Sequence, residues 1–345
     1  MSLVTCITVA YGPTPTLPRL VESLGRHAGD VSPDIVVVTQ PDPEGCREDV
    51  GHLADRARHI RLNENLGFGP ANNLAVARCD SEFVAFVNPD LVVTEGWLSP
   101  LLRALADPAV AIVAPPLLDG EGRLAEAGQA IFSDGGTEAM GGSHWPDGYD
   151  SVMFARDVDY ASAACWVMRR DVFSSLGGFD ASYAPAYFED SDLAMTAYCR
   201  GLVSRLVVDR PVVHHHVAAS EQRNSLARSS RARFEAKWAD RLAEQPRRDA
   251  GRFDARRVRD HRASRRIALL FEGAADSEDL VDVASTAAAE AEANPRDRVT
   301  LVVPRGDTVG RLRRAHRAAG LEVIAVDTVR RADVSWATEM RSVGK

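Results

Sequence analysis

Short runs of β-branched and other apolar residues alternate with amphipathic stretches from residue 1 to about 218, and this alternation limits the choice of fold more than any other feature. The first amphipathic stretch, Leu17–Leu24, carries leucine and valine at helical spacing. Such alternation is typical of an α/β fold with a mostly parallel sheet covered by helices. Ligands of these sheets bind at the carboxyl ends of the strands, so the residues after each run are the candidates for function. The predicted strands are Val4–Ala10, Ile35–Thr39, Ile60–Leu62, Phe83–Val87 and Ala111–Ala114.

The composition, 45% hydrophobic and 26% charged residues in 345, excludes wholesale disorder and fibrous architecture. The formal net charge of −8 argues against a general polyanion binder, so no nucleic-acid partner is expected. Five scattered cysteines without a C-x-x-C pair argue against a disulfide framework or a zinc knuckle and favour a reducing, cytoplasmic location. No apolar run approaches the roughly 18–20 residues of a membrane span, and Leu3–Ala10 is interpreted as a buried strand instead of a signal peptide.

Residues 221–266 differ from the rest of the chain because 14 Arg and one Lys face seven acidic residues, a local charge of +8. Phe234, Trp238 and Leu242 recur every fourth residue and predict one apolar helical stripe. Three interpretations stay open: a solvated helix that packs this stripe on the main domain, a membrane-surface contact, or a lid whose arginines touch a diphosphate.

The C-terminal residues predict a compact βαβαβ unit with Ala-rich and Arg-rich helices between its strands. Three strands are few for an independent sheet, so we expect this unit to pack on the first domain, to form a homo-oligomer contact, or to begin a larger domain. The predicted strands are Ile267–Phe271, Val299–Val303 and Val323–Val326. The predicted domains are 1–220 (the main α/β domain), 221–265 (basic helical linker) and 266–345 (small α/β domain).

A Gly-, Asp- and Ser-rich segment from Leu118 to about Val158 shows no clear periodicity and is predicted as a long loop. Loops of that length are usually functional or disordered. Trp145 and Tyr149 could line a substrate pocket there, and an ordered surface excursion without a ligand is the alternative.

Polar side chains follow the apolar run Phe83–Val87, where Asn88 and Asp90 are two residues apart and would face the same side. A carboxylate at this edge could hold Mg²⁺ or Mn²⁺ against a bound diphosphate. The alternative is an Asn-Pro-Asp turn in which Asp90 caps a helix.

Two further clusters carry titratable groups. Glu189, Asp190 and Asp192 begin a helical stretch, so they could complement the helix dipole, or Asp190 could be a partly desolvated general base behind an aromatic pair. His214-His215-His216 ends another apolar run and could be structural or ligate a metal. Adjacent histidines on a strand point to opposite faces, so at most one or two of them could bind one ion.

The segment Asn65–Asn73 follows a predicted strand and opens an Ala-rich helix. Its glycines allow the backbone to approach a ligand, and a helix N-terminus attracts phosphate. Neither G-x-x-x-x-G-K-[ST] nor G-x-G-x-x-G occurs in the chain, which excludes a P-loop NTPase and argues against a standard dinucleotide fold.

Taken in order, these segments resemble glycosyltransferase family 2, the inverting GT-A nucleotide-sugar transferases, across roughly residues 3–240. The Asn-Pro-Asp form and the Asn-x-Gly-Phe-Gly loop are most similar to rhamnosyltransferase-type members, which extend cell-surface glycans. The segments that carry the resemblance are Val9-Ala10-Tyr11, Asn65-Leu66-Gly67-Phe68-Gly69 with Asn72 and Asn73, Asn88-Pro89-Asp90, Arg169-Arg170, Gly177-Gly178-Phe179-Asp180, Glu189-Asp190-Ser191-Asp192-Leu193, and a histidine four to six residues before Ser220.

The resemblance implies a role for each matching position. Asp90 would bind Mg²⁺ or Mn²⁺ together with a histidine, by spacing His215, and Asp190 would deprotonate the acceptor hydroxyl. Glu189 and Asp192 would orient Asp190 or contact the acceptor. The other expected acceptor contacts are Trp145, Trp166 and Phe188. The nucleotide-sugar donor would lie against Ala10, Tyr11, Gln40, Asn65, Gly67, Phe68, Asn72, Asn88 and Asp90.

Two segments depart from the family pattern. The turn after the second strand reads Thr39-Gln40-Pro41-Asp42 where the family usually has an acidic residue that holds the nucleobase, so base recognition is altered or passes to Asp42. Ser162-Ala163-Ala164 replaces a common Ser-Gly-Ala stretch, and the extra methyl of Ala163 would narrow the site there. No Gln-x-x-Arg-Trp motif follows, which argues against a processive synthase.

The leading hypothesis is therefore a metal-dependent inverting transferase that moves one sugar to a hydroxyl of a glycan, lipid-linked or small-molecule acceptor. It would work in the cytoplasm, with residues 221–266 available to contact the inner face of the plasma membrane. A catalytically silent sugar-nucleotide or glycan-binding homologue is the first alternative, motivated by the altered Thr39-Gln40 turn. A nucleotidyltransferase is the second, and the absence of a Gly-rich, Lys-bearing N-terminal loop argues against it.

Overall fold

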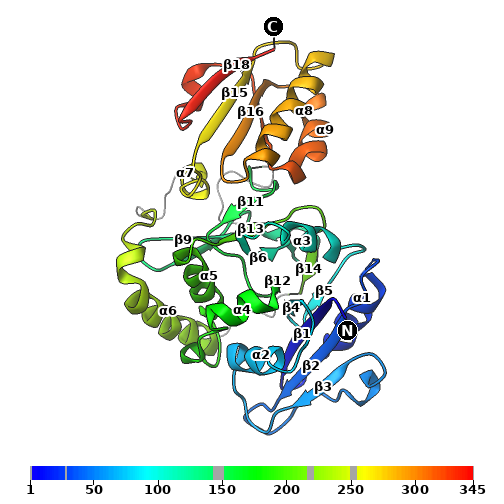
Figure 1. Cartoon of the computed structure of the whole chain (residues 1–345). Helices are drawn as coiled ribbons and strands as arrows, with labels where there is room; N and C mark the ends of the chain where they lie inside the picture. The colour runs from blue at the N-terminus through cyan, green and yellow to red at the C-terminus, as the bar shows by residue number, and fades with distance from the viewer. Residues whose placement is uncertain (1, 28, 143–150, 216–220, 249–254, 345) are drawn as a thin grey trace.

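The computed structural model of the chain describes residues 2–27, 29–142, 151–215, 221–248 and 255–344 (Figure 1). Its N-terminal part is built around one eight-stranded sheet in the order β11-β13-β6-β12-β4-β1-β2-β3. Strands β3, β2, β1 and β4 are parallel to one another, whereas β12 runs antiparallel to β4 and to β6. All five strands predicted in this part are confirmed. The strands are β1 Val4–Tyr11, β2 Asp34–Gln40, β3 Arg58–Arg61, β4 Phe83–Val87, β6 Val110–Ala114, β11 Arg156–Val158, β12 Cys165–Arg169 and β13 Val203–Leu206.

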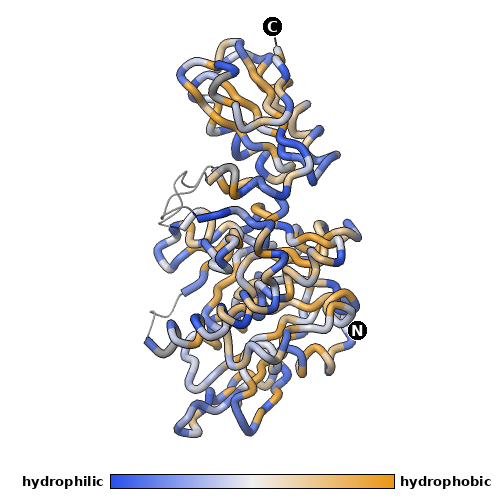
Figure 2. Tube along the Cα trace, turned by 90° about the vertical axis from the view of Figure 1, so that its left-hand side faces the viewer, coloured by the Kyte–Doolittle hydropathy of each residue, from blue (hydrophilic) through white to orange (hydrophobic). Residues whose placement is uncertain are grey.

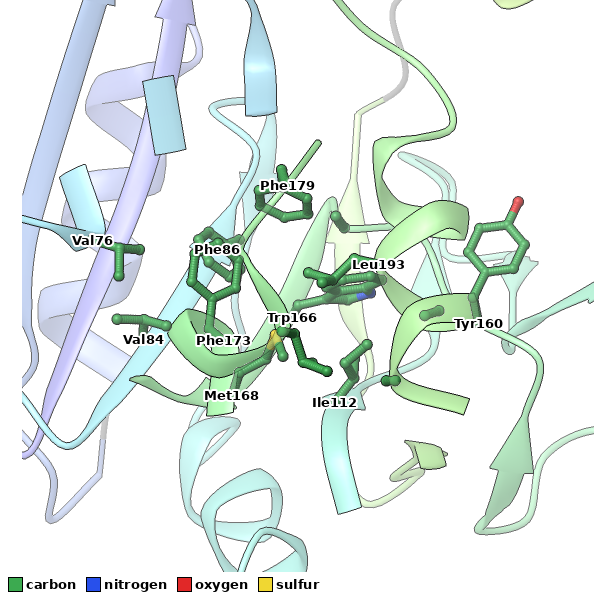
Figure 3. Close-up of a cluster of buried hydrophobic side chains, with 14 of the residues drawn as sticks. Val76, Val84, Phe86, Ile112, Tyr160, Trp166, Met168, Phe173, Phe179 and Leu193 are labelled. Carbon is green, nitrogen blue, oxygen red and sulfur yellow. The ribbon is translucent and has the colours of Figure 1, made fainter. Parts of the chain in front are cut away.

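Helices cover both faces of this sheet because its central strands are apolar on both sides. Neighbouring residues of one strand enter different cores: Trp166 packs in the cluster of Phe86 and Phe179, whereas Val167 packs with Val87 on the other face (Figure 3). Each fully buried side chain of this size contributes about 1.5–3 kcal/mol to folding. The helices are α1 Leu17–His27, α2 Phe68–Val76, α3 Leu98–Ala104, α4 Arg170–Leu176 and α5 Glu189–Cys199, with short 3₁₀ helices at Gly51–Leu53 and Ala181–Tyr183.

The segment predicted as a long loop, Leu118 to Val158, contains short strands instead. A second sheet has the order β5-β14-β7-β8 and includes β8 from this segment and β14, which ends at His214. Strands β9 and β10 form a separate pair. These strands are only two or three residues long, which explains why no periodicity marks them in the sequence. They are β5 Leu91–Val92, β7 Leu117–Leu118, β8 Leu124–Glu126, β9 Gln129–Ile131, β10 Thr137–Ala139 and β14 Val212–His214.

The basic segment forms helix α6, Glu221–Leu242, and helix α7, Ala255–Arg259. In α6 the apolar stripe faces the main domain: Phe234 is fully buried, and its ring centroid lies 5.4 Å from that of Phe188. The interpretation of 221–266 as a helix packed on the main domain is confirmed for this stripe.

The C-terminal residues form a parallel sheet in the order β17-β16-β15-β18 with its own core (Figure 2). The prediction of three strands was incomplete, because β18 adds a fourth beside β15. Its elements are β15 Arg266–Phe271, α8 Glu278–Ala293, β16 Arg298–Pro304, α9 Thr308–His316, β17 Glu322–Val326 and β18 Glu339–Val343, with 3₁₀ helices at Arg317–Ala319 and Arg331–Val334.

A buried ionic cluster joins this unit to the rest of the chain. Arg259 of α7 donates to Asp260 and to Glu322 of β17, and Arg298 of β16 donates to the same Asp260. The guanidinium groups of Arg259 and Arg298 lie 4.9 and 4.8 Å from the ring centroid of Phe154, which precedes β11 in the main sheet. The domain boundaries at residues 220 and 265 stay predictions.

Candidate active site

Asp90 lies between β4 and β5, at the carboxyl end of a central strand, as expected. Strand β5 pairs with β14, and this pairing brings His214 Nε2 to 3.1 Å from Asp90 Oδ1. His215, the metal partner expected from spacing, has a different contact with Asp90: its backbone N–H donates to the Asp90 carbonyl oxygen at 2.9 Å. Its role as a metal ligand stays a prediction. His215 follows the last residue of β14, and its ring lies against Gly120, where an added Cβ would be 3.0 Å from Nδ1. His216 lies outside the described residues.

This Asp–His pair provides two candidate metal ligands. In the part of the chain that the structure describes, no group of three or more His, Cys, Asp or Glu side chains could hold a metal ion by itself. A carboxylate and an imidazole suit a divalent cation such as Mn²⁺, whose other positions would be filled from outside the protein. Asn88 is half-buried beside this edge, and its backbone N–H donates to the carbonyl oxygen of Ala164 at 2.8 Å.

Asp190 stands at the first turn of α5, which the chain reaches through strained backbone. Tyr187 and Phe188 both have positive φ, 78° and 69°. Such conformations cost on the order of 1–3 kcal/mol each in non-glycine residues, and they cluster at active sites. The Asp190 carboxylate accepts the N–H of Ser191 at 2.8 Å and that of Ala163 at 3.3 Å, while burial raises its pKa. Its ionisation near neutral pH stays a prediction.

The two carboxylates next to Asp190 have different surroundings. Glu189 is buried, and this burial, followed by the charge of Asp190, raises its pKa well above the usual range. Asp192 is 3% exposed, and its oxygens accept from Tyr183, Lys237 and Trp238 at 3.1, 2.9 and 2.7 Å. The expectation that Asp192 contacts the acceptor is not met, because its carboxylate is fully engaged in joining α5 to α6.

Lys237 is a residue that sequence reasoning missed. Its ammonium group donates to Asp180 at 2.8 Å as well as to Asp192, and so it connects two of the resemblance-bearing segments. Burial raises the pKa of Asp180, but hydrogen bonds from Lys237 and Ser182 outweigh it and bring this pKa to about 2. Only the rarity of lysine in an arginine-rich chain could have drawn attention to this position.

Replacing Lys237 by Met is expected to lower the free energy of unfolding by about 1–2 kcal/mol at pH 7. The change leaves the buried carboxylate of Asp192 without its cation, while solvent screens the half-exposed Asp180. Arg241→Met is the matched control on the same helix, since its ion pair with Glu244 is exposed and should contribute less than about 1 kcal/mol. Urea unfolding measures both, and equal losses would contradict the role given to Lys237.

The loop predicted to bind the nucleotide is held from both sides. Gln40 of β2 accepts the N–H of Leu66 at 2.8 Å through its side-chain oxygen, and Asn65 accepts the N–H of Gly67 at 2.9 Å. Gly67 has φ +87°, and a Cβ there would lie 2.6 Å from Pro185, so only glycine fits. This contact places the loop directly against the segment that leads into α5.

The remaining predicted donor residues differ in their access to a ligand. Tyr11 ends β1 and is 48% exposed at the carboxyl edge of the sheet, where a nucleobase could stack. Ala10 and Gln40 are buried, and Asn72 is 1% exposed with its amide donating to Phe68 within α2. The side chain of Asn72 is therefore buried under α2 and does not face a ligand surface.

Of the residues predicted to contact the acceptor, the structure describes Trp166 and Phe188, and both belong to the same hydrophobic cluster. Trp166 is fully buried, and its indole N–H donates to the carbonyl oxygen of Ala161 at 2.8 Å, so it is a core residue and does not contact an acceptor (Figure 3). Phe188 is half-buried at the start of α5. Trp145 and Tyr149 lie outside the described residues.

Glu126, from the segment predicted as a loop, is a second residue that sequence reasoning missed. Burial and the charge of Asp190 raise its pKa to about 7, against hydrogen bonds from Ser162 and Gln129. Glu126 accepts the N–H of Ser162, the residue before Ala163, whose own N–H donates to Asp190, so Glu126 lies one residue away from a contact of the proposed base.

Comparison with known proteins identifies the family. The family model described as Glycosyl transferase family 2 matches residues 5–177, half of the chain. The chain belongs to glycosyltransferase family 2. The transferase is 26% identical over 231 residues to N-acetylglucosaminyl-diphospho-decaprenol L-rhamnosyltransferase of Mycobacterium tuberculosis, covering 61% of this chain and 75% of that one. It is 28% identical over 192 residues to the protein y4gI of Sinorhizobium fredii, a match that covers 54% of this chain and only 21% of that protein.

Solved structures agree on the fold of the transferase. The structure described as GalNAc-T7 with UDP, GalNAc and Mn²⁺ matches with a TM-score of 0.54 at 14% identity, covering 70% of this chain and 49% of that chain. At this identity the likeness shows the fold alone. The fold is the GT-A fold of glycosyltransferases, and the expected α/β class is confirmed.

Proposed function

We propose that this glycosyltransferase is metal-dependent and inverting, and that it moves a sugar, in the first instance rhamnose, from a nucleotide donor to a hydroxyl of a glycan or glycolipid. The observation that carries the proposal is the turn Ser162–Ala164, which contacts both halves of the site: Ala163 N–H donates to the half-buried carboxylate of Asp190 at 3.3 Å, and the carbonyl oxygen of Ala164 accepts the N–H of Asn88, two residues before Asp90, at 2.8 Å. Asp90 in turn lies 3.1 Å from His214. Charge for a diphosphate and a base for a hydroxyl are the two requirements of the reaction.

Asp90 and His214 would hold Mg²⁺ or Mn²⁺, which would neutralise charge on the departing diphosphate. GalNAc-T7, which has the same fold, was solved with UDP and Mn²⁺ together, and this supports the choice of donor class and ion. In this arrangement Tyr11 and the Asn65–Phe68 loop would receive the nucleotide, and Asn88 would lie against its diphosphate.

Asp190 would act on the acceptor side. Its carboxylate accepts the proton of the attacking hydroxyl while the hydroxyl oxygen forms the new glycosidic bond and the bond to the diphosphate breaks. One direct displacement of this kind inverts the anomeric configuration. The raised pKa of Asp190 brings its basicity nearer to neutrality, where a general base is most effective.

The name of the Mycobacterium tuberculosis relative supports a rhamnose donor and a lipid-linked acceptor. No helix in the described part of the chain is long and apolar enough to cross a membrane. We place the enzyme in the cytoplasm. Exposed arginines of α6 such as Arg228 and Arg233 would contact anionic lipid, since the apolar stripe of the same helix packs inward. Homo-oligomer formation through the C-terminal unit is part of the same proposal.

A thermal-shift panel tests the donor site. The donors are dTDP-L-rhamnose, UDP-glucose, GDP-mannose and dTDP-glucose, each with Mn²⁺ or with EDTA. A donor at about 100 times its Kd should add about 2.7 kcal/mol of stability with Mn²⁺ only, and this gain should vanish in Asp90→Ala. Asp55→Ala, at an exposed position of the same domain, is the control and should keep it. A flat response of the wild type to every donor contradicts the proposal.

The second candidate is a silent binding homologue. The turn after β2 lacks the usual acid, and the Gln40 side chain that replaces it is engaged with Leu66. Donor binding without release of nucleoside diphosphate, with acceptor present, would favour this candidate. Measurable release excludes it.

A further inference from the structure

The carboxylate of Glu126 is fully used within the protein. The residue ends β8 and is 7% exposed. Its Oε1 accepts the backbone N–H of Ser162 at 2.7 Å, and its Oε2 accepts the side-chain N–H of Gln129 at 2.7 Å. The amide oxygen of Gln129 in turn accepts the hydroxyl of Tyr160 at 2.7 Å. Glu126 is thus a buried anchor and not a group that faces a ligand.

The amide of Ala163, which follows the anchored amide of Ser162, contacts the proposed base, Asp190. Ser162 donates its backbone N–H to Glu126, and Ala163 donates its backbone N–H to Asp190 Oδ2 at 3.3 Å. The side chain of Ser162 closes the same short turn by accepting the N–H of Ala164 at 3.2 Å. Two successive amides therefore point at two carboxylates from different elements, β8 and α5.

We propose that Glu126 is a positioning residue for Asp190: by holding the Ser162 N–H it fixes the turn from which the Ala163 N–H reaches the Asp190 carboxylate. The inference rests on the proposed function, in which Asp190 is the base. Hydrogen bonds to an ionised group are the stronger ones, and small displacements of a base cost large factors in rate. The departure Ser162-Ala163-Ala164 from the family pattern lies at this turn.

Hydrogen exchange of the backbone tests the clamp without any substrate. In Glu126→Ala the amides of Ser162 and Ala163 should exchange at least about tenfold faster, because their anchor is gone. In Glu126→Gln the amide oxygen still accepts the Ser162 N–H, so protection should stay close to that of the wild type. Unchanged exchange in Glu126→Ala overturns the proposal, whether or not the protein transfers any sugar.

Turnover supplies the second arm, with release of nucleoside diphosphate measured for dTDP-L-rhamnose, UDP-glucose and GDP-mannose in Mn²⁺. Glu126→Ala should lower kcat by about 10–100-fold with little change in the KM for the donor. Glu126→Gln should keep most of kcat, because its amide oxygen still accepts the Ser162 N–H and holds the turn in place. Equal losses in the two variants would mean that the charge, and not the position, matters, and would overturn the proposal. A wild type without turnover counts against the proposed function, and the exchange result then decides the clamp alone.

Discussion

Asp190→Asn is expected to lower kcat for sugar transfer by about 10²–10⁴-fold while nucleotide-sugar binding stays within a few-fold of the wild type. The amide keeps the shape of the side chain, so helix α5 and the strained backbone at Phe188 should be retained. It cannot take the proton of an acceptor hydroxyl. One of the two N–H groups that face the carboxylate, from Ser191 or Ala163, would still find an oxygen.

The measurement is initial-rate kinetics with a nucleotide-sugar donor and an N-acetylglucosaminyl-diphospho-lipid acceptor, alongside the thermal shift with donor. Asp171→Asn is the matched control, because Asp171 also lies in the first turn of a helix, α4, but is exposed. It should leave kcat unchanged. Full activity in Asp190→Asn would show that another group takes the proton, and loss of donor binding would show that Asp190 belongs to the donor side.

His214→Ala and His215→Ala are expected to differ although the two residues are neighbours. His214 Nε2 lies 3.1 Å from Asp90, so its loss should weaken the Mn²⁺ response of donor binding by about 100-fold or more. The ring of His215 lies against Gly120, so its loss should leave that response within about threefold of the wild type.

Mn²⁺ titration of the donor-dependent thermal shift measures both variants. Circular dichroism serves as the check on folding, because His214 is 6% exposed and its removal leaves a cavity. The reverse order of effects would restore His215 as the ligand that sequence spacing suggests. No Mn²⁺ dependence in any variant would remove the metal from the mechanism.

Long apolar strands were predictable from sequence, and residues held by short ones were not. Runs such as Phe83–Val87 are buried on both faces, so their composition alone predicts strands at the right positions. Strand β14 has three residues and takes its register from β5, a pairing between residues more than 100 positions apart. No local pattern contains that register, and a one-residue difference exchanges the faces of His214 and His215.

The contrast between local patterns and distant partners also explains which other predictions agree with the structure. Asp90 and Asp190 follow or begin regular elements, where position along the chain predicts position in space. Trp166 shows the opposite case: an aromatic residue near a site can belong to the core as readily as to a pocket. Glu126 and Lys237 act through partners in distant segments, which composition and periodicity do not reveal. In β18 the polar residues Glu339 and Arg341 are half-buried and Met340 is exposed, so its sequence lacks the apolar–polar alternation that marks a strand.

The ionic cluster at Phe154 limits which substitutions the chain can accept during evolution. Arg259 lies before the boundary that composition places at residue 265, whereas its partner Glu322 and the second arginine, Arg298, lie after it. Removing one member leaves an uncompensated charge in a buried position, which costs several kcal/mol. Single substitutions on either side are therefore disfavoured unless the other side changes too. We therefore expect the two units to be inherited together. An exchange of the C-terminal unit between relatives would have to include Arg259 and Asp260.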